Sequence, residues 1–279
     1  MTSLTQHSSS RFVKLIAIGD SKTRKTTSLG SLVKLGYKLR ILDFDNLLHP
    51  LRSFVEAECP QFMDNIEYRT LRDQRKATAD GPHVTPKAYI DGVKMLDRWK
   101  YKTEDGEVDL GVPAEWGPDC VLVIDSLSRW CDAAFDWRLP LTPRGKGGEI
   151  DKRATYGDAQ KAVENNLSLL SSDNFETNVV IICHILYQED DDGKIKGYPQ
   201  GVGQKLSPKI PQYFPNVVLY KHKANSYVIQ TKSTPMIDLA FSKPFDAEDE
   251  YDNATGLGEI FNVLKEPPIV ASKPKLRKV

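Results

Sequence analysis

Short apolar runs alternate with amphipathic stretches along most of the chain. Phe12–Ile18, Val121–Ile124 and Asn178–Ile182 are mostly apolar and rich in β-branched residues, as expected for strands buried on both faces. Lys25–Leu35 carries apolar residues at helical spacing and is followed by Gly36, which suits a helix end. Buried strands separated by helices predict an α/β fold with a mostly parallel central sheet flanked by helices.

The same patterns place the remaining elements. Further strands are predicted at Lys38–Asp43 and Ile66–Leu71, and in a late pair, Val217–Tyr220 and Tyr227–Thr231, joined by a tight turn at Asn225-Ser226. Further helices are predicted at Pro50–Glu58, Pro86–Lys100 and Ala154–Leu170. Residues 101–118 contain two prolines and an Asp-Gly pair, and predict an inserted hairpin or loop.

These elements divide the chain into three parts. Residues 1–10 are polar and predict a flexible N-terminal lead. Residues 11–240 hold the strands and helices and form the predicted core. Residues 241–279 are a C-terminal extension whose end is rich in proline and basic residues, a composition typical of a disordered tail.

Composition narrows the class of protein. The hydrophobic fraction is 40% and the charged fraction 27%, as in ordinary soluble globular proteins. The formal net charge is zero, so any contact with nucleic acid must come from local loops. The four cysteines show no CxxC pairing, the N-terminus lacks the apolar stretch of a signal peptide, and no apolar run is long enough to span a bilayer. We therefore expect a cytoplasmic protein with no membrane contact.

The first strand is followed by a candidate phosphate-binding loop. The pattern G-x-x-x-x-G-K-[ST] binds phosphates through backbone N–H groups, a lysine and a hydroxyl that reaches Mg²⁺. Gly19, Lys25 and Thr26 stand at the required spacing. The nucleotide-binding residues predicted from this segment are Gly19, Asp20, Ser21, Lys22, Thr23, Arg24, Lys25, Thr26 and Thr27.

Arg24 stands where the pattern has its second glycine. Glycine there lets the backbone turn and approach the anion without a Cβ in the way. Arginine therefore either blocks the turn and distorts the phosphate cradle, or adds a favourable positive charge to it. From this segment alone, a basic turn between a strand and a helix is a further interpretation.

A second motif completes the candidate site. Val121–Ile124 ends in Asp125, the form of a strand whose terminal carboxylate supports the Mg²⁺ shell, so Thr26 and Asp125 are the predicted metal residues. Other chemistries are disfavoured. Cys183 and His184 have no partners at metal-ligand spacing, Ser126 lacks the nucleophile-elbow context, and the first turn lacks G-x-G-x-x-G.

Four segments in order give the chain a resemblance to the RecA family, and within it to phage-encoded RecA-like ATPases of single-strand annealing and recombination. They are Lys25-Thr-Thr-Ser-Leu-Gly-Ser-Leu, Ile41-Leu-Asp-Phe-Asp-Asn, Val123-Ile-Asp-Ser-Leu and Val180-Ile-Ile-Cys-His184, and the resemblance covers roughly residues 12–235. It implies a RecA-like P-loop core that uses ATP and Mg²⁺. The catalytic residues it implies are Lys25, Asp45, Asp125 and His184.

The resemblance also implies roles for these residues. Asp45 orients the attacking water, although aspartate is one methylene shorter than the usual glutamate; helix capping and loop solvation are the other interpretation of Asp43 and Asp45. His184 or Gln188, at the end of a strand, senses the γ-phosphate; a structural histidine is the alternative.

A loop rich in glycine and lysine follows His184, and it suits stacking and pairing with single-stranded DNA. The DNA-binding residues predicted are Lys194, Lys196, Tyr198, Gln204 and Lys205. The alternative is a surface hairpin turned at Asp192-Gly193. Lys221 and Lys223 resemble lysines that reach into a neighbour's nucleotide site, and exposed strand-end lysines are the alternative.

Together these features predict an ATP-dependent, single-stranded-DNA-binding recombination or annealing factor. The expected partners are DNA, further copies of the chain in a ring or filament, and a single-strand-binding protein or annealase. A phage origin would place it in the host cytoplasm. Two alternatives stay open: a catalytically inactive P-loop scaffold in a replication or recombination complex, and a helicase-loader or partition-type ATPase.

Overall fold

The computed structural model describes residues 11–265, apart from residues 80, 105, 146, 190 and 191. Its strands are β1 Lys14–Gly19, β2 Lys38–Asp43, β3 Ile66–Thr70, β4 Gln74–Thr78, β5 Gly81–Thr85, β6 Lys100–Thr103, β7 Gly106–Asp109, β8 Gly117–Asp125, β9 Thr177–Cys183, β10 Ile185–Glu189, β11 Ile195–Pro199, β12 Asn216–Lys223, β13 Ser226–Gln230 and β14 Glu250–Asp252. Its α-helices are α1 Lys25–Ser28, α2 Gly30–Lys34, α3 His49–Glu58, α4 Ala88–Asp97, α5 Leu127–Arg138, α6 Lys152–Ser171, α7 Gly203–Leu206 and α8 Gly256–Lys265.

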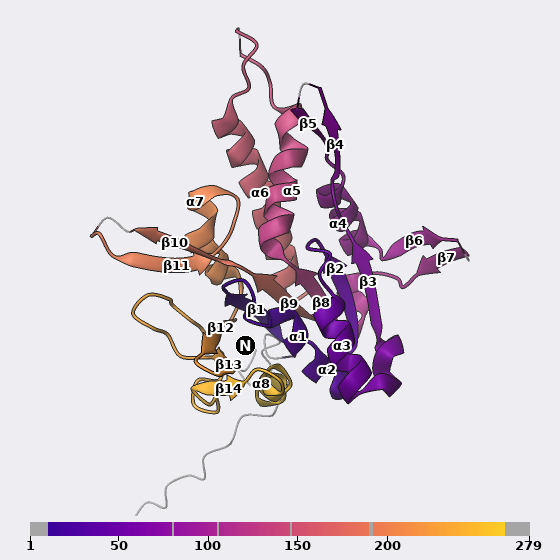
Figure 1. Ribbon diagram of the computed structural model, residues 1–279, viewed down its shortest axis with the longest axis vertical. Coiled ribbons are helices and arrows are strands. Elements are labelled where there is room, and N and C mark those ends of the chain that lie inside the picture. The colour runs from indigo at the N-terminus through magenta and orange to yellow at the C-terminus, as the bar shows by residue number, and fades with distance from the viewer. Residues whose placement is uncertain (1–10, 80, 105, 146, 190–191, 266–279) are drawn as a thin grey trace, which may run out of the picture.

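Eight of these strands form one central sheet, in the order β14-β13-β12-β1-β9-β8-β2-β3 (Figure 1). The strands from β12 to β3 in this order are all parallel, while β13 and β14 add an antiparallel edge. Strand β9 lies between β1 and β8, although it follows both in the chain. Parallel strands end at the same edge, so the ends of β1, β2, β8 and β9 meet there.

Helices cover both faces of the sheet, as the apolar runs predict. Alternate residues of β1 face opposite sides: Ile16 and Ile18 pack with α4, α5 and α6, whereas Leu15 and Ala17 pack with α1, α2, α3 and α8. Both clusters are almost fully buried. Two faces covered in this way fix the sheet rigidly beneath the loops at its edge.

Three two-stranded hairpins extend from this core: β4–β5, β6–β7 and β10–β11 (Figure 1). The β6–β7 hairpin begins at Lys100, one residue before the insertion predicted at residues 101–118, and the rest of it falls inside that insertion. The β4–β5 hairpin and helix α5 were not predicted. No helix in the described part of the chain is long and apolar enough to cross a membrane.

The structure corrects two local predictions. The helix predicted at Lys25–Leu35 is divided at Leu29 into α1 and α2, because Leu29 bonds back to Thr26 and Leu32 to Leu29 in three-residue steps. The turn between β12 and β13 is Ala224-Asn225, not Asn225-Ser226, since Lys223 pairs with Ser226 and Ala224 has the positive φ of 42°.

The segment predicted as a C-terminal extension contributes to the same fold. Strand β14 pairs with β13 at the edge of the central sheet. Helix α8 packs Leu257, Ile260 and Phe261 into the core on the α2 side. The predicted flexible lead at residues 1–10 and the predicted disordered tail beyond residue 265 lie outside the described residues.

Candidate functional site

The predicted phosphate loop, Asp20–Arg24, connects the end of β1 to the start of α1. Gly19 fits only as glycine, because a Cβ there would lie 2.7 Å from the Tyr220 carbonyl oxygen and 2.8 Å from Thr23 Oγ1. The Thr23 hydroxyl donates to the Asp20 carbonyl at 2.8 Å and closes the loop on itself. Lys22 and Arg24 have φ values of 66° and 62°, in the left-handed region. The loop thus adopts a conformation that glycine favours, with two non-glycine residues in it.

The Arg24 side chain lies on the side of the loop that faces β13. Its guanidinium carbon is 4.0 Å from the centre of the Tyr227 ring, a cation–π contact. The sheet order places β13 and β8 on opposite sides of β1, so this contact directs the guanidinium away from Asp125. The left-handed turn is formed with arginine at this position.

Lys25 is buried at the start of α1 and reaches back across the loop. Its ammonium donates to the carbonyl oxygens of Gly19 and Asp20, each at 2.7 Å. Burial lowers the pKa of Lys25, while nearby Asp125 acts in the opposite direction. The lysine is therefore held inside the loop, at the place where a phosphate would lie between the backbone N–H groups.

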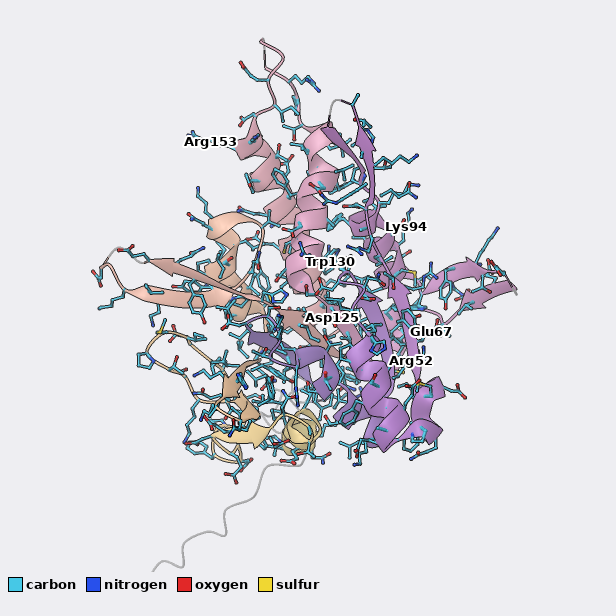
Figure 2. The ribbon with its side chains drawn as sticks, viewed as in Figure 1. Arg52, Glu67, Lys94, Asp125, Trp130 and Arg153 are labelled. Atoms are coloured by element: carbon cyan, nitrogen blue, oxygen red, sulfur yellow. The ribbon has the colours of Figure 1, made fainter. Side chains whose placement is uncertain are left out.

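Thr26 and Asp125 meet across the sheet edge. The Thr26 hydroxyl donates to Asp125 Oδ2 at 2.8 Å, although the residues are 99 positions apart. Figure 2 shows Asp125 near the centre of the molecule, at the end of β8. Burial raises the pKa of Asp125 to about 7, and Asp43 and Asp45 add to this effect. A carboxyl group with such a raised pKa is suited to a cation that restores its charge.

These groups fit the magnesium and triphosphate that the sequence predicts. Hydroxyl and carboxylate oxygens are the ligands that Mg²⁺ prefers, and Mg²⁺ usually keeps several waters and phosphate oxygens in its shell. Thr26 and Asp125 would supply the protein side of such a shell, with Lys25 facing the phosphates. No group of three or more His, Cys, Asp or Glu side chains that could hold a metal alone occurs in the described part of the chain.

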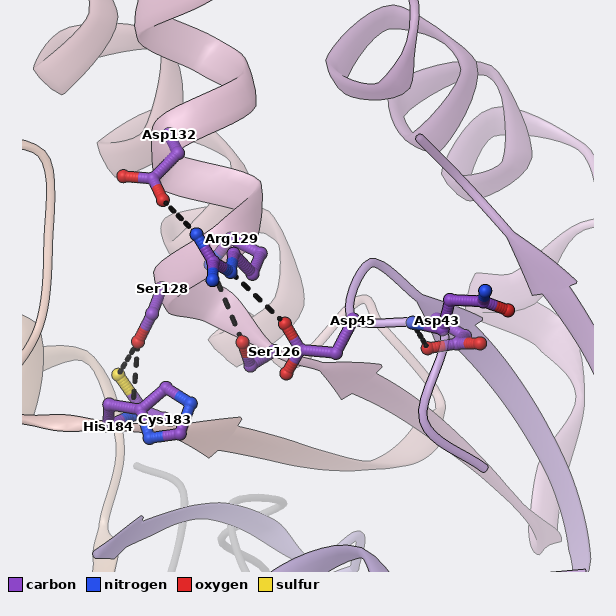
Figure 3. A network of polar contacts seen from close by, with 9 residues as sticks. Asp43, Asp45, Ser126, Ser128, Arg129, Asp132, Cys183 and His184 are labelled. Carbon is purple, nitrogen blue, oxygen red and sulfur yellow. Dashed lines mark hydrogen bonds and ion pairs between the residues drawn. The ribbon is translucent and has the colours of Figure 1, made fainter. Parts of the chain in front are cut away.

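A second carboxylate, Asp45, lies next to this centre after β2. The Asp45 and Phe44 backbone N–H groups donate to the Asp125 carbonyl, at 3.4 and 2.6 Å. Asp45 Oδ1 is 3.5 Å from Arg129 Nε on α5, and the same guanidinium is 3.3 Å from Asp132 (Figure 3). Arg129 thus orients a carboxylate that faces the predicted phosphate site.

Asp43 has a different setting. It is buried, accepts from the Asn46 N–H at 2.7 Å and from the Thr70 hydroxyl at 3.1 Å, and has a pKa raised by burial. These bonds stabilise the turn after β2. Asp43 is neither solvated nor a helix cap, since the N-cap of α3 is Leu48.

His184 follows β9, directly between the ends of β1 and β8. Its backbone N–H donates to the Ser128 hydroxyl at 3.0 Å, and Ser128 also contacts Cys183 at 3.5 Å (Figure 3). Burial lowers the pKa of His184, and the charge of Lys25 adds to this effect. The imidazole is therefore a neutral group close to the phosphate loop at physiological pH.

A comparison with known protein families identifies the family to which the chain belongs. The AAA domain family matches residues 11–238. The chain belongs to the AAA domain family. The predicted α/β fold class is confirmed: this AAA domain is an α/β P-loop ATPase domain with a large, mostly parallel central sheet flanked by helices.

Two solved structures are similar to this AAA domain. One is an ATPase from the type III secretion system of pathogenic bacteria, with 12% identity, a TM-score of 0.41 and coverage of 76% of this chain. The chain spans 53% of that protein's length. The other is the RadB recombinase, with 12% identity, a TM-score of 0.42 and coverage of 79% of this chain and 80% of that one. A search of curated proteins gives no match.

The residues predicted to bind DNA lie on and after the β10–β11 hairpin of the AAA domain. Lys194 is 3.7 Å from Asp192, and Lys196 is 3.5 Å from Asp238, so both cations are paired with acidic residues. Tyr198 is half-buried in β11, whereas Lys205 is exposed in α7. The carbonyl oxygen of Gln204 accepts from Gln188 at 3.4 Å. The segment is an antiparallel hairpin, as in the alternative interpretation.

The lysines predicted to act in a neighbour's site lie at the end of β12. Lys223 is paired with Glu250 of β14 at 2.5 Å. Lys221 lines a cavity of about 530 Å³, together with Tyr187, Tyr227 and the loop residues Asp20–Thr23. Lys221 therefore faces the phosphate loop of its own chain in this cavity.

Four neighbours of the AAA domain's site were not predicted: three lie beside the phosphate loop and one lies beside Asp45. Tyr187 of β10 lines the same cavity as Asp20, and burial and this carboxylate raise the pKa of the tyrosine. Asn253 donates to the Thr23 carbonyl at 3.4 Å, and Tyr227 packs on Arg24. Arg129 pairs with Asp45. No sequence motif marks these four partners, because each meets the site through the three-dimensional order of the strands.

Proposed function

We propose that this AAA domain binds ATP with Mg²⁺ and couples its hydrolysis to single-stranded DNA in recombination or annealing. The observation that supports the nucleotide half most directly is the 2.8 Å contact between Thr26 and Asp125 beside the buried Lys25. This is the arrangement of hydroxyl, carboxylate and lysine that a P-loop uses for magnesium and phosphate.

Each residue has a distinct task in this proposal. Lys25 leaves the Gly19 and Asp20 carbonyls and binds the β- and γ-phosphates, while the loop N–H groups surround them. Thr26 and Asp125 would hold Mg²⁺, which would neutralise the charge that develops on the transferred phosphoryl group. Asp45, oriented by Arg129, positions the attacking water. Phosphoryl transfer depends mainly on such positioning and electrostatic stabilisation.

The proposed coupling to single-stranded DNA is supported by the position of the β10–β11 hairpin. The hairpin follows β9 after the single residue His184, and its Tyr187 lines the same cavity as Asp20–Thr23 of the phosphate loop. A change in the shape of the loop would therefore alter the surroundings of the hairpin. Its exposed Tyr187 offers a ring for base stacking, whereas Lys194 and Lys196 must exchange acidic partners for phosphate. We expect only a shallow dependence of DNA binding on salt, because few cations are available to release counterions.

A homo-oligomer is the expected working form of the proposed ATPase. Lys221 and Lys223 lie at the end of β12, at the same sheet edge as the phosphate loop. In a ring or filament, these lysines would reach a neighbour's triphosphate. Lys223 would have to leave Glu250 to do so.

ATP turnover tests the proposal when it is measured with and without single-stranded DNA. We expect the native chain to hydrolyse ATP slowly, and the DNA to increase the rate. Lys25→Ala is the matched loss-of-function control, and Arg24→Gly tests whether the arginine limits turnover. If the chain binds ATP but single-stranded DNA changes neither turnover nor affinity, the proposed coupling to DNA is contradicted. The proposed binding of ATP would not be affected by this result.

A catalytically inactive scaffold is the second candidate. The observation that favours it is the position of Lys25, whose ammonium bonds to carbonyl oxygens of the loop and occupies the space for phosphate. In this case neither the native chain nor Arg24→Gly binds ATP. The same turnover and binding measurements separate the two functions.

A further inference from the structure

Arg24 is one of two non-glycine residues of the phosphate loop in the left-handed conformation, together with Lys22. It precedes α1 with φ 62° and ψ 29°, and no side chain caps the helix there. A non-glycine residue in this left-handed conformation is strained, because its Cβ crowds the following carbonyl oxygen. In the P-loop pattern the backbone N–H groups of this turn bind phosphate, so a contact that holds Arg24 in this conformation affects the predicted phosphate site.

Tyr227 on β13 supplies that support. The Arg24 guanidinium carbon lies 4.0 Å from the centre of the Tyr227 ring. The opposite partner of Tyr227 in the sheet, His222, stacks on the same tyrosine with ring centres 4.5 Å apart and an angle of 29° between the planes. Arginine, tyrosine and histidine thus form a continuous stack that extends from the loop onto the antiparallel edge of the sheet.

The position of Tyr227 is fixed by the strand beside it and by the loop itself. The Asn253 backbone N–H, after β14, donates to the Tyr227 carbonyl at 3.0 Å. The Asn253 side chain is buried and donates to the Thr23 carbonyl at 3.4 Å. One asparagine therefore holds both the strand that carries Tyr227 and the loop residue that precedes Arg24.

We propose that Tyr227 is a positioning residue for nucleotide binding, which acts by holding Arg24 on the β13 side of the phosphate loop. The proposal rests on the proposed ATP-binding function. Held there, the guanidinium stays out of the phosphate cradle, and the left-handed turn at residue 24 keeps the shape that glycine would give it. Without the ring, the strained turn relaxes and the loop N–H groups lose their common direction. The chain thus compensates for its missing glycine with an aromatic residue from a distant strand.

The experiment is a double-mutant cycle on affinity for MgATP. The proteins are the native chain, Tyr227→Leu, Arg24→Gly and the variant with both changes; leucine keeps an apolar side chain of moderate size on the strand but has no aromatic face. We expect Tyr227→Leu to raise the dissociation constant about fivefold in the native background, the effect of losing one partly exposed cation–π contact. In the Arg24→Gly background the same change should have no effect, because the glycine needs no support.

Controls separate positioning from a general loosening of the edge. Tyr227→Phe retains the aromatic face and should bind MgATP as tightly as the native chain. Lys232→Ala removes an ion pair with Asp249 at the same edge, without contact to the loop, and should also leave affinity unchanged. Thermal unfolding of each variant shows whether the fold is retained.

The outcomes distinguish this proposal from the function on which it rests. Equal affinities of Tyr227→Leu and the native chain would overturn the proposal, with ATP binding intact. Equal losses in the native and Arg24→Gly backgrounds would also overturn it, because Tyr227 would then act by another route. If no variant binds MgATP, including Arg24→Gly, the proposed function fails and this proposal fails with it.

Discussion

Replacing Asp125 by asparagine should stabilise the free protein at alkaline pH while removing its nucleotide chemistry. Burial raises the pKa of Asp125 from 3.8 to about 7, so ionising it in the folded state costs about 4 kcal/mol at pH 8, at 1.36 kcal/mol per unit. Asparagine has no charge and can still accept from Thr26. Its new NH₂ group lacks a partner, which costs about 2 kcal/mol. The net gain at pH 8 is about 2 kcal/mol.

The sign of this effect depends on pH. Between pH 3.8 and about 7 the folded native chain binds the Asp125 proton and the unfolded chain does not, so native stability falls as pH rises. The asparagine variant lacks this fall. Its stability relative to the native chain should therefore rise by about 1.4 kcal/mol per pH unit across that window and be negative near pH 4.

Urea denaturation at pH 4, 5, 6, 7 and 8, without nucleotide or Mg²⁺, measures this difference directly. Asp158→Asn is a suitable control because it also removes an acidic side chain, but from the exposed surface of α6, where the carboxylate pairs with Arg138. A stability difference for Asp125→Asn that is constant across the pH range would refute the reasoning. So would a variant that is less stable than the native chain at pH 8.

Three other substitutions in and around the loop have expected outcomes of their own. Arg24→Gly should raise the free energy of unfolding by about 1 kcal/mol in urea denaturation, because glycine adopts the left-handed turn without strain; no gain would contradict this. Gly19→Ala should lower it by about 3 kcal/mol or more, since the new Cβ meets the Tyr220 carbonyl at 2.7 Å, and native-like stability would refute the close contact. Asp45→Asn should lower kcat for ATP at least about 100-fold with little change in KM, and equal losses in both would argue against a role in orienting water.

Much of this fold could be predicted from the sequence, because its strongest signals are local. The apolar runs at Phe12–Ile18, Val121–Ile124 and Asn178–Ile182 all lie in strands of the central sheet. Buried parallel strands need continuous apolar sequence, and little else produces it at this length. Helix α5 was missed because Leu127–Arg138 mixes four charged residues with its apolar ones, and its buried side rests on packing against α4 and α6.

The central residues of the site could also be predicted from the sequence. The spacing of Gly19, Lys25 and Thr26 and the carboxylate after an apolar run predict residues that the structure brings together, and Thr26 and Asp125 are in direct contact. Motif spacing identifies them because a phosphate loop is a local structure, and because parallel strands bring their ends to one edge.

The surroundings of the loop could not be predicted in this way. Asn253 contacts Thr23 across 230 positions of sequence, and Tyr227 meets Arg24 only because β13 is antiparallel to β12. Ion pairing is similarly hidden: the partner of Lys196 is Asp238, on a separate segment. Lysines can be counted from the sequence, but only the fold shows which of them are already paired with acidic residues.

Equilibrium binding of ATP in the presence and absence of Mg²⁺, at pH 8, tests whether this site binds the nucleotide and the metal together. In the proposed site Lys25 binds the phosphates, and Thr26 and Asp125 hold the metal. We expect saturable binding that is strengthened by Mg²⁺ in the native chain, and that is lost in Lys25→Ala while the fold is retained. Binding that is unaffected by Mg²⁺ and by Lys25→Ala, or no binding by the native chain and by Arg24→Gly, would contradict the proposed site.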